Sequence, residues 1–190
     1  MNKLVLVNKN NRISEEFLNS VELIEVKDVN DKIILVEKET YEAYLCLKEF
    51  LEHKNIIIGI SSGYRGLEHQ QRVYDDFVLR YGKEYAEKVV APVGCSEHHT
   101  GLAIDIDLCI DGKFLTSNIE LMEHEDIYLD IHEHLYKFGF ILRYMKGKED
   151  ITGYPYEPWH IRYVGSASKD IYLSKLTLEE YYIENMSLQN

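Results

Sequence analysis

The chain has 190 residues, a formal net charge of −12 and three cysteines. This length suits a single domain that can bury a core of its own without disulfide bonds. The acidic balance argues against nucleic acid and anionic membranes as partners, because both attract a basic face. The cysteines are odd in number and show no CxxC spacing, which argues against a disulfide framework and indicates a reducing compartment.

The start of the chain, MNKLVLVNKNN, contains an apolar run of only four residues. A secretory signal peptide needs a longer run, of about 7–15 apolar residues. No segment approaches the roughly 20 apolar residues of a membrane-spanning helix. We therefore expect a cytoplasmic protein without a membrane span.

The first quarter of the chain predicts short strands followed by one amphipathic helix. Residues 4–7, 21–26 and 33–36 are β-branched or leucine-rich runs separated by Asn/Asp-rich turns, which is typical of strands or extended segments. Between residues 39 and 53 the apolar side chains recur at helical spacing. This pattern predicts a helix that packs one face inward.

A buried strand and two helices are predicted next. Residues 56–60 form an unbroken apolar run suited to a buried strand, and Gly63 permits a tight change of direction after it. Helices are predicted over residues 66–80 and 81–90. The Ala-Pro-Val-Gly sequence at residues 91–94 then forces a loop.

The second half of the chain mixes strands and helices in irregular order. Between residues 102 and 108 the pattern alternates until Asp105 and Asp107 interrupt the apolar positions, as in a strand that offers alternate side chains to a site. The remaining predicted elements are a hairpin turn at Asp111-Gly112, a helix over 126–138, a strand over 140–144, a Gly-rich loop over 146–156, a strand over 159–164, and helices over 166–174 and 178–185. This order predicts one α+β domain over residues 1–190, with a largely antiparallel central sheet flanked by helices.

Three segments hold the chemistry-bearing residues: SSGYR at 61–65, SEHHTGLAIDID at 96–107 and EPWHIRYVG at 157–165. A catalytic zinc uses three His or carboxylate ligands and keeps a fourth position open for water. His98 and Asp105 lie seven residues apart across a glycine, so a loop followed by a strand can bring both to one ion. His160 would be the third ligand, and Glu157 is suited to hold the attacking water and accept its proton.

The patterns S-x-H-x-x-G-x-A-x-D and E-x-W-H resemble those of the zinc D,D-peptidases of peptidase family M15. Within that family the chain is similar to the VanY-type D-alanyl-D-alanine carboxypeptidases and to the VanXY-type enzymes of vancomycin resistance. The segments SGYR, CSEHHTGLAIDI, GFILRY and YEPWHIRYVG match in order, so the resemblance covers residues 57–165. It implies a fold like that of the hedgehog signalling domains and D,D-peptidases.

The resemblance also implies roles for individual residues. His98, Asp105 and His160 would bind Zn²⁺, and Glu157 would be the general base. Arg65 would stabilise the oxyanion of the tetrahedral intermediate or hold the terminal carboxylate of the substrate. The residues expected to contact the peptide or shape its pocket are Ser96, Gln70, Tyr64 and Trp159.

The implied substrates are peptidoglycan precursor peptides that end in D-Ala-D-Ala. Relatives with dipeptidase activity tend to carry an acidic residue at the position of Ser62, where it suits a free amino terminus. Serine there favours carboxypeptidase action on a longer stem peptide, with the D-Ala-D-Ala dipeptide as a second possible substrate. Two alternatives stay open: L,D-carboxypeptidase action on tetrapeptides, and a non-catalytic, zinc-stabilised binding module.

Several neighbouring residues have plainer interpretations. His99 is expected to be structural or to face the substrate, and Asp107 to contact a ligand residue or to lie at the surface. His132 and His134 are two residues apart on a predicted helix, a spacing that does not share a face, so we expect both to be solvated. Cys95 is not expected to bind the metal, because a thiolate would not suit a site of oxygen and nitrogen ligands.

Overall fold

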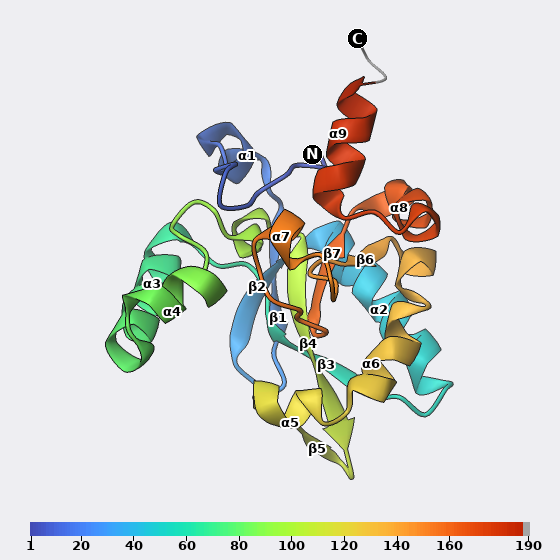
Figure 1. Cartoon of the computed structure of the whole chain (residues 1–190). Coiled ribbons are helices and arrows are strands. Elements are labelled where there is room, and N and C mark those ends of the chain that lie inside the picture. Colours follow the sequence, from blue (N-terminus) through green and yellow to red (C-terminus); the bar gives the residue numbers. More distant parts are fainter. Residues whose placement is uncertain (188–190) are drawn as a thin grey trace.

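The computed structural model describes residues 1–187, which form a five-stranded antiparallel sheet, a separate two-stranded hairpin and surrounding helices (Figure 1). The strands are β1 (Leu23–Lys27), β2 (Ile33–Glu37), β3 (Ile58–Ser62), β4 (Ala103–Ile110), β5 (Lys113–Phe114), β6 (Phe140–Leu142) and β7 (His160–Tyr163). The main sheet has the order β3-β4-β7-β6, with β5 paired to the end of β4, and every pairing is antiparallel. The predicted α+β fold with an antiparallel sheet is confirmed.

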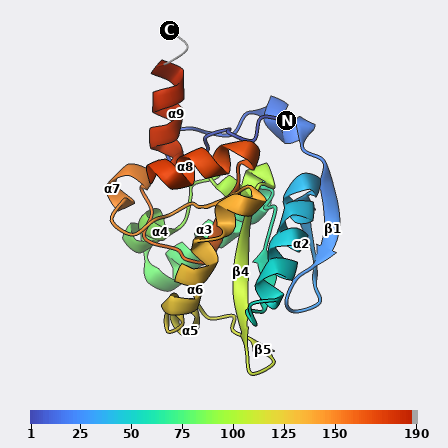
Figure 2. The same cartoon turned by 90° about the vertical axis from the view of Figure 1, so that its right-hand side faces the viewer.

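Helices lie on several sides of this sheet (Figure 2). The α-helices are α1 (Glu15–Ser20), α2 (Lys38–Glu52), α3 (Leu67–Tyr81), α4 (Lys83–Val89), α5 (Asn118–Met122), α6 (Glu125–His132), α7 (Glu149–Thr152), α8 (Ser168–Ser174) and α9 (Leu178–Ser187). The 3₁₀ turns are η1 (Glu97–Thr100), η2 (Leu135–Phe138) and η3 (Gly165–Ala167). Within the described residues, none of the helices is long and apolar enough to cross a bilayer.

The core lies on one face of β4 because side chains alternate along a strand. Ile104, Ile106 and Leu108 point into a buried cluster that also contains Leu47 of α2 and Tyr128 of α6. The intervening positions of β4 are Asp105 and Asp107, which therefore belong to the opposite face of the sheet. One strand thus anchors the core and presents carboxylates on its other side.

The β1–β2 hairpin docks against the segments that carry two of the sequence motifs. Tyr64 donates its backbone N–H to Leu35 O at 2.6 Å, and Glu37 donates to Gly101 O at 3.1 Å. At Gly63 an added Cβ would lie 2.4 Å from Leu35 O, so the close approach of the two segments requires glycine there. Gly63, where the sequence predicted a tight change of direction, is thus required by a close contact between two chain segments.

Some predicted elements differ from the structure. The single helix expected over 126–138 is wrong: α6 ends at His132, and the chain turns again as η2 before Gly139 at φ 83°. The loop expected over 146–156 contains α7. The short helices α1 and α5 were not predicted, because six and five residues are too few for a helical period to stand out.

The segment at residues 4–7 is not paired as a strand. Its neighbours Asn8 and Asn11 form an isolated antiparallel bridge, and the carbonyls of Lys3 and Val5 accept hydrogen bonds from the Arg162 guanidinium. The apolar run therefore packs as an extended segment over the main body, with Val7 completely buried.

The packing of α2 gives a stability test with a built-in control. Leu47 is fully buried, whereas Leu45, on the same helix, is 45% exposed. Leu47→Ala should lower the free energy of unfolding by about 2–5 kcal/mol, because it removes buried methyl groups and leaves a cavity. Leu45→Ala should change it by no more than about 0.5 kcal/mol. Chemical denaturation measures both, and equal effects would contradict the assigned burial.

Candidate metal and catalytic site

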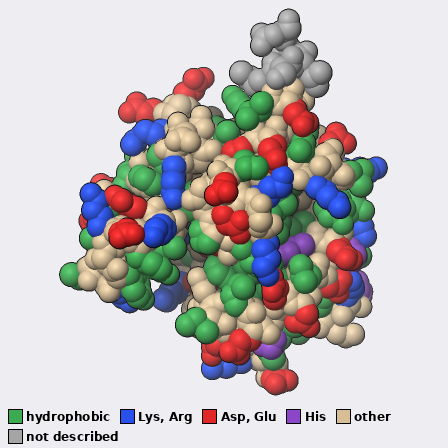
Figure 3. All heavy atoms as spheres, in the orientation of Figure 1, with side chains coloured by type: hydrophobic (Ala, Val, Ile, Leu, Met, Phe, Trp, Pro, Cys, Tyr) green, Lys and Arg blue, Asp and Glu red, His purple; other side chains and the backbone are tan. Residues whose placement is uncertain are grey.

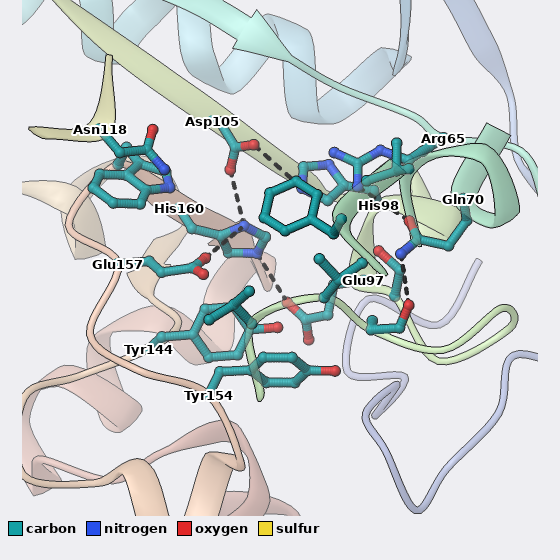
Figure 4. A pocket seen from close by; sticks show the side chains of 17 residues that line it. Arg65, Gln70, Glu97, His98, Asp105, Asn118, Tyr144, Tyr154, Glu157 and His160 are labelled. Atoms are coloured by element: carbon teal, nitrogen blue, oxygen red, sulfur yellow. Dashed lines mark hydrogen bonds and ion pairs between the residues drawn. The ribbon is translucent and has the colours of Figure 1, made fainter. Parts of the chain in front are cut away.

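The three sequence motifs meet where β3, β4 and β7 lie side by side (Figure 4). His98 lies on η1, Asp105 on β4 and His160 at the start of β7. Asp105 is paired directly with His160 across β4 and β7, and with Ser62 across β3 and β4. The sheet register therefore brings together residues that are far apart in the sequence.

His98, Asp105 and His160 form a group whose candidate ligand atoms all lie within 4.8 Å of one another. His98 Nε2 lies 3.3 Å from Asp105 Oδ2, and His160 Nδ1 lies 2.9 Å from Asp105 Oδ1. His98 Nδ1 donates to Gly63 O at 2.8 Å, so the lone pair of its Nε2 faces the group. The expected convergence of these three residues is confirmed.

This donor set suits a divalent cation such as zinc. Burial by itself would lower the pKa of His160, but the neighbouring carboxylates of Asp105, Glu97 and Glu157 raise it to about 9. These carboxylates therefore favour a positive charge within the group. Two imidazoles and one carboxylate are also the ligand types of catalytic zinc sites. The group has three members among the described residues, so a fourth coordination position of a bound metal would stay open for water.

Glu157 lies beside this group with properties that suit a general base. Its Oε2 is 4.0 Å from His160 Nδ1, and its side chain is 19% exposed. Burial raises the pKa of Glu157 to about 7, with Asp105 adding to the shift and His160 and Arg65 opposing it. A carboxylate with a pKa near neutrality can both accept and return a proton.

Arg65 is held in a fixed position at the same cavity. Its guanidinium donates to Gln70 Oε1 at 3.1 Å and to Ser62 Oγ at 3.3 Å. Its backbone N–H donates to His98 O at 3.0 Å, and its carbonyl contacts the ring of His99. Burial lowers the pKa of Arg65, while the charges of Asp105 and Glu157 oppose this, and the guanidinium stays protonated.

A cavity of about 180 Å³ joins these groups. Its lining residues include Arg65, Gln70, Val73, Phe77, Val90, Ala91, Ser96, Glu97, His98, Asp105, Asn118, Tyr144, Tyr154, Glu157, Trp159 and His160. This volume is below the roughly 300–1,000 Å³ typical of sites for drug-sized ligands. The cavity therefore suits a small residue with a polar end.

The expected peptide contacts fall into two groups. Ser96, Gln70 and Trp159 line the cavity, but the amide of Gln70 is engaged by Arg65 and by Ala91 O. Tyr64 and Ser62 are not among the residues that line it. Ser62 instead supports the guanidinium of Arg65.

Comparison with known proteins identifies the family of this chain. The family model VanY, described as D-alanyl-D-alanine carboxypeptidase, matches residues 33–166. The chain belongs to the VanY family.

Among curated VanY relatives, the chain is 40% identical over 151 residues to a protein named putative carboxypeptidase YodJ from Bacillus subtilis, covering 77% of this chain and 53% of that one. The chain therefore spans about half the length of that relative in the match. It is 33% identical over 193 residues to the bifunctional D-Ala-D-Ala dipeptidase and carboxypeptidase VanXYC of Enterococcus gallinarum, covering 96% of this chain and 94% of that one.

Two solved structures extend the comparison. A vancomycin resistance D,D-pentapeptidase VanY in complex with Zn(II) has a TM-score of 0.81 and 35% identity, covering 96% of this chain and 99% of that one. The LD-carboxypeptidase LdcB has a TM-score of 0.80 and 36% identity, covering 93% of this chain and 84% of that one. The VanY fold is thus shared by enzymes named for two different stereochemical specificities.

The sequence interpretation missed Glu97, which lies directly behind His160. Its Oε1 accepts hydrogen bonds from Arg143 Nε and Arg162 Nη1, each at 2.7 Å, and its Oε2 lies 3.6 Å from His160 Nε2. Burial by itself would raise the pKa of Glu97, but the two arginines hold it well below its usual range. Arginines inside the predicted strands over 140–144 and 159–164 were the available signal, because a buried arginine needs a carboxylate.

Three residues near the motifs, His99, Asp107 and Cys95, lie in different environments. His99 is fully buried, and its Nε2 accepts from Gly94 N at 3.0 Å, so it has a structural role. Asp107 is buried and accepts from Ser61 Oγ at 2.7 Å, and burial raises its pKa to about 6. Cys95 is buried and does not belong to the ligand group.

The prediction that His132 and His134 are solvated is wrong for His132. The ring is partly buried, and its Nε2 donates to Pro158 O at 2.9 Å, within the turn that carries Glu157. Burial lowers the pKa of His132 from 6.5 to about 4, against the opposing effect of this hydrogen bond. His134 is partly exposed and contacts Lys54 and Asp130.

The lowered pKa of His132 predicts a pH-dependent stability. Between pH 6.5 and about 4 the unfolded chain binds the proton more readily than the folded one, so the free energy of unfolding falls as pH is lowered through this range. His132→Gln should reduce this slope, while His53→Gln, at an exposed position, should leave it unchanged. Urea denaturation at several pH values measures the slopes, and the same slope in His132→Gln as in the wild type would contradict the assignment.

Proposed function

We propose that this protein is a zinc-dependent D-alanyl-D-alanine carboxypeptidase that removes the terminal D-Ala from peptidoglycan precursor peptides. The observation that carries the proposal is the convergence of His98, Asp105 and His160 beside Glu157 in one small cavity. The similarity to a VanY structure in complex with Zn(II) supports the choice of metal. The cytoplasmic location expected from the sequence stays a prediction.

The chemistry divides between the metal and the residues of the chain. A zinc ion held by His98, Asp105 and His160 would supply a Lewis acid for a peptide carbonyl and for the attacking water. Glu157 takes the proton from that water and returns it to the departing amine of D-alanine. Burial raises the pKa of Glu157, which favours the protonated form that the second transfer needs.

Arg65 supplies the recognition of the peptide end. Among the described residues that line the cavity, it is the one Lys or Arg side chain, and a carboxypeptidase must select a free terminal carboxylate. The same guanidinium can instead stabilise the oxyanion that forms during attack. Val73, Phe77 and Val90 add apolar walls that suit the methyl group of D-alanine.

An L,D-carboxypeptidase acting on tetrapeptides is the second candidate. The similarity to LdcB, which is named an LD-carboxypeptidase, favours it. Dipeptidase action is a further extension, supported by the similarity to the bifunctional VanXYC along almost the whole chain. A purely structural zinc site is disfavoured, because such sites generally use four protein ligands and this group has three described members.

A substrate panel separates these functions. D-Ala-D-Ala, a stem tetrapeptide and a stem pentapeptide are incubated in parallel with the zinc-loaded protein, and the products are identified by mass. The proposal expects the pentapeptide to lose one D-Ala. Cleavage of the tetrapeptide alone would establish L,D specificity, and no release of alanine from any substrate would favour a binding module.

The role of Glu157 gives a sharper prediction. Glu157→Gln should lower the turnover number by at least about 100-fold, because the amide cannot accept the proton. Zinc content should stay at the wild-type level, since Glu157 is outside the ligand group. Steady-state kinetics and metal analysis measure the two effects. Glu123→Gln, at an exposed position, is the control, and undiminished hydrolysis by Glu157→Gln would refute the mechanism.

A further inference from the structure

A buried network of four charged side chains connects the candidate metal site to the C-terminal helix. Arg143 donates through Nε to Glu97 Oε1, and through Nη1 and Nη2 to both carboxylate oxygens of Glu179 at 2.8 and 2.6 Å. Glu179 lies in the first turn of α9 (Figure 1). The fourth member, Arg162, donates to Glu97 Oε1 at 2.7 Å.

The network carries no net charge and is almost inaccessible to solvent. The two arginines are completely buried, Glu97 is 1% exposed and Glu179 is 7% exposed. Two positive and two negative charges therefore compensate one another in a region of low dielectric, where an unpaired charge is strongly unfavourable. Asn8 adds a hydrogen bond to Glu179 Oε1 at 3.0 Å.

The arrangement leaves one oxygen of Glu97 for His160. Both arginines bind Oε1, whereas Oε2 has no hydrogen bond and lies 3.6 Å from His160 Nε2, which is likewise without a hydrogen bond. An Nε2–H directed at this carboxylate leaves the lone pair on Nδ1, the atom next to Asp105. Carboxylates behind histidine ligands orient the ring in this way in many metal sites.

We infer that Glu179 is a positioning residue for the metal site, acting through Arg143 and Glu97 on the ring of His160. Without the Glu179 carboxylate, Arg143 keeps Glu97 as its nearest carboxylate partner. The guanidinium then draws Glu97 into a two-oxygen pairing and removes Oε2 from His160. The inference rests on the proposed zinc site and adds the C-terminal helix to it.

This role places a functional residue outside the segment matched by the VanY family model. The match ends at residue 166, before α9, and begins at residue 33, after Asn8. Leu178 of α9 also belongs to a buried cluster against which Leu4, Leu6 and Tyr181 pack. Residues from both ends of the described chain therefore pack around the buried network.

Zinc affinity tests the inference. Competition with a chromophoric chelator gives the Kd of the wild type, Glu179→Gln and Glu180→Gln. Glu179→Gln should bind zinc about tenfold more weakly, the lower end of the effect seen when partners of metal ligands are removed. Glu180 pairs with Lys148 and bonds Thr177 in the same helical turn, so Glu180→Gln is the matched control and should keep the wild-type Kd.

A spectroscopic measurement separates positioning from simple loss of stability. The visible spectrum of the Co²⁺-substituted protein reports the ligand geometry, and it should change in Glu179→Gln but not in Glu180→Gln. Wild-type zinc affinity and an unchanged spectrum in Glu179→Gln, even with a lower melting temperature, would overturn the inference. If that variant does not fold, Glu179→Asp replaces it, because aspartate keeps the negative charge on a shorter side chain. Wild-type zinc affinity in Glu179→Asp would then contradict the inference.

The same measurements distinguish this inference from the proposed function. A wild-type protein that binds zinc but hydrolyses no peptide contradicts the function and leaves the comparison of affinities intact. Active wild-type protein with equal zinc affinity in both glutamate variants contradicts the positioning role alone.

Discussion

The antiparallel register between β4 and β7 is the constraint on which the site depends. It sets Asp105 directly opposite His160, and a shift of either strand by one residue would turn the side chain on that strand to the other face of the sheet. That register is fixed by the core, because Ile104 and Ile106 must stay buried on the face opposite Asp105. Hydrophobic burial on one side of β4 therefore determines the geometry of the polar groups on the other.

Within this frame, two neighbouring carboxylates acquire opposite properties. Burial raises the pKa of Glu157 to about 7, whereas the contacts of Asp105 with His98 and His160 outweigh burial and lower the pKa of Asp105 well below its usual range. One carboxyl group is therefore permanently charged and suited to bind a cation. The other can exchange a proton near neutral pH, and this separation of pKa values is how a site divides its acid, base and ligand roles.

Strands, helices and site residues could be predicted wherever the spacing of residues along the chain indicated them. The strands around Asp105 and His160, the helix over 39–53 and the three candidate ligand residues could be inferred because each has a local pattern. Glu97 and Glu179 could not, since their roles depend on arginines that approach from distant strands. The break between α6 and η2 was missed for a related reason: the apolar period continues across it while the backbone turns.

The contact at Gly63 links metal binding to the docking of the hairpin. Gly63 O orients His98, and the same residue passes so close to Leu35 O that no side chain fits between them. The hairpin that contains Leu35 also buries Val26 and Val36 in the same cluster as Ile104 and Ile106. Displacement of the hairpin would therefore disturb the orientation of His98 and the packing of the core together, so release of the metal from His98 would be coupled to the stability of the whole sheet.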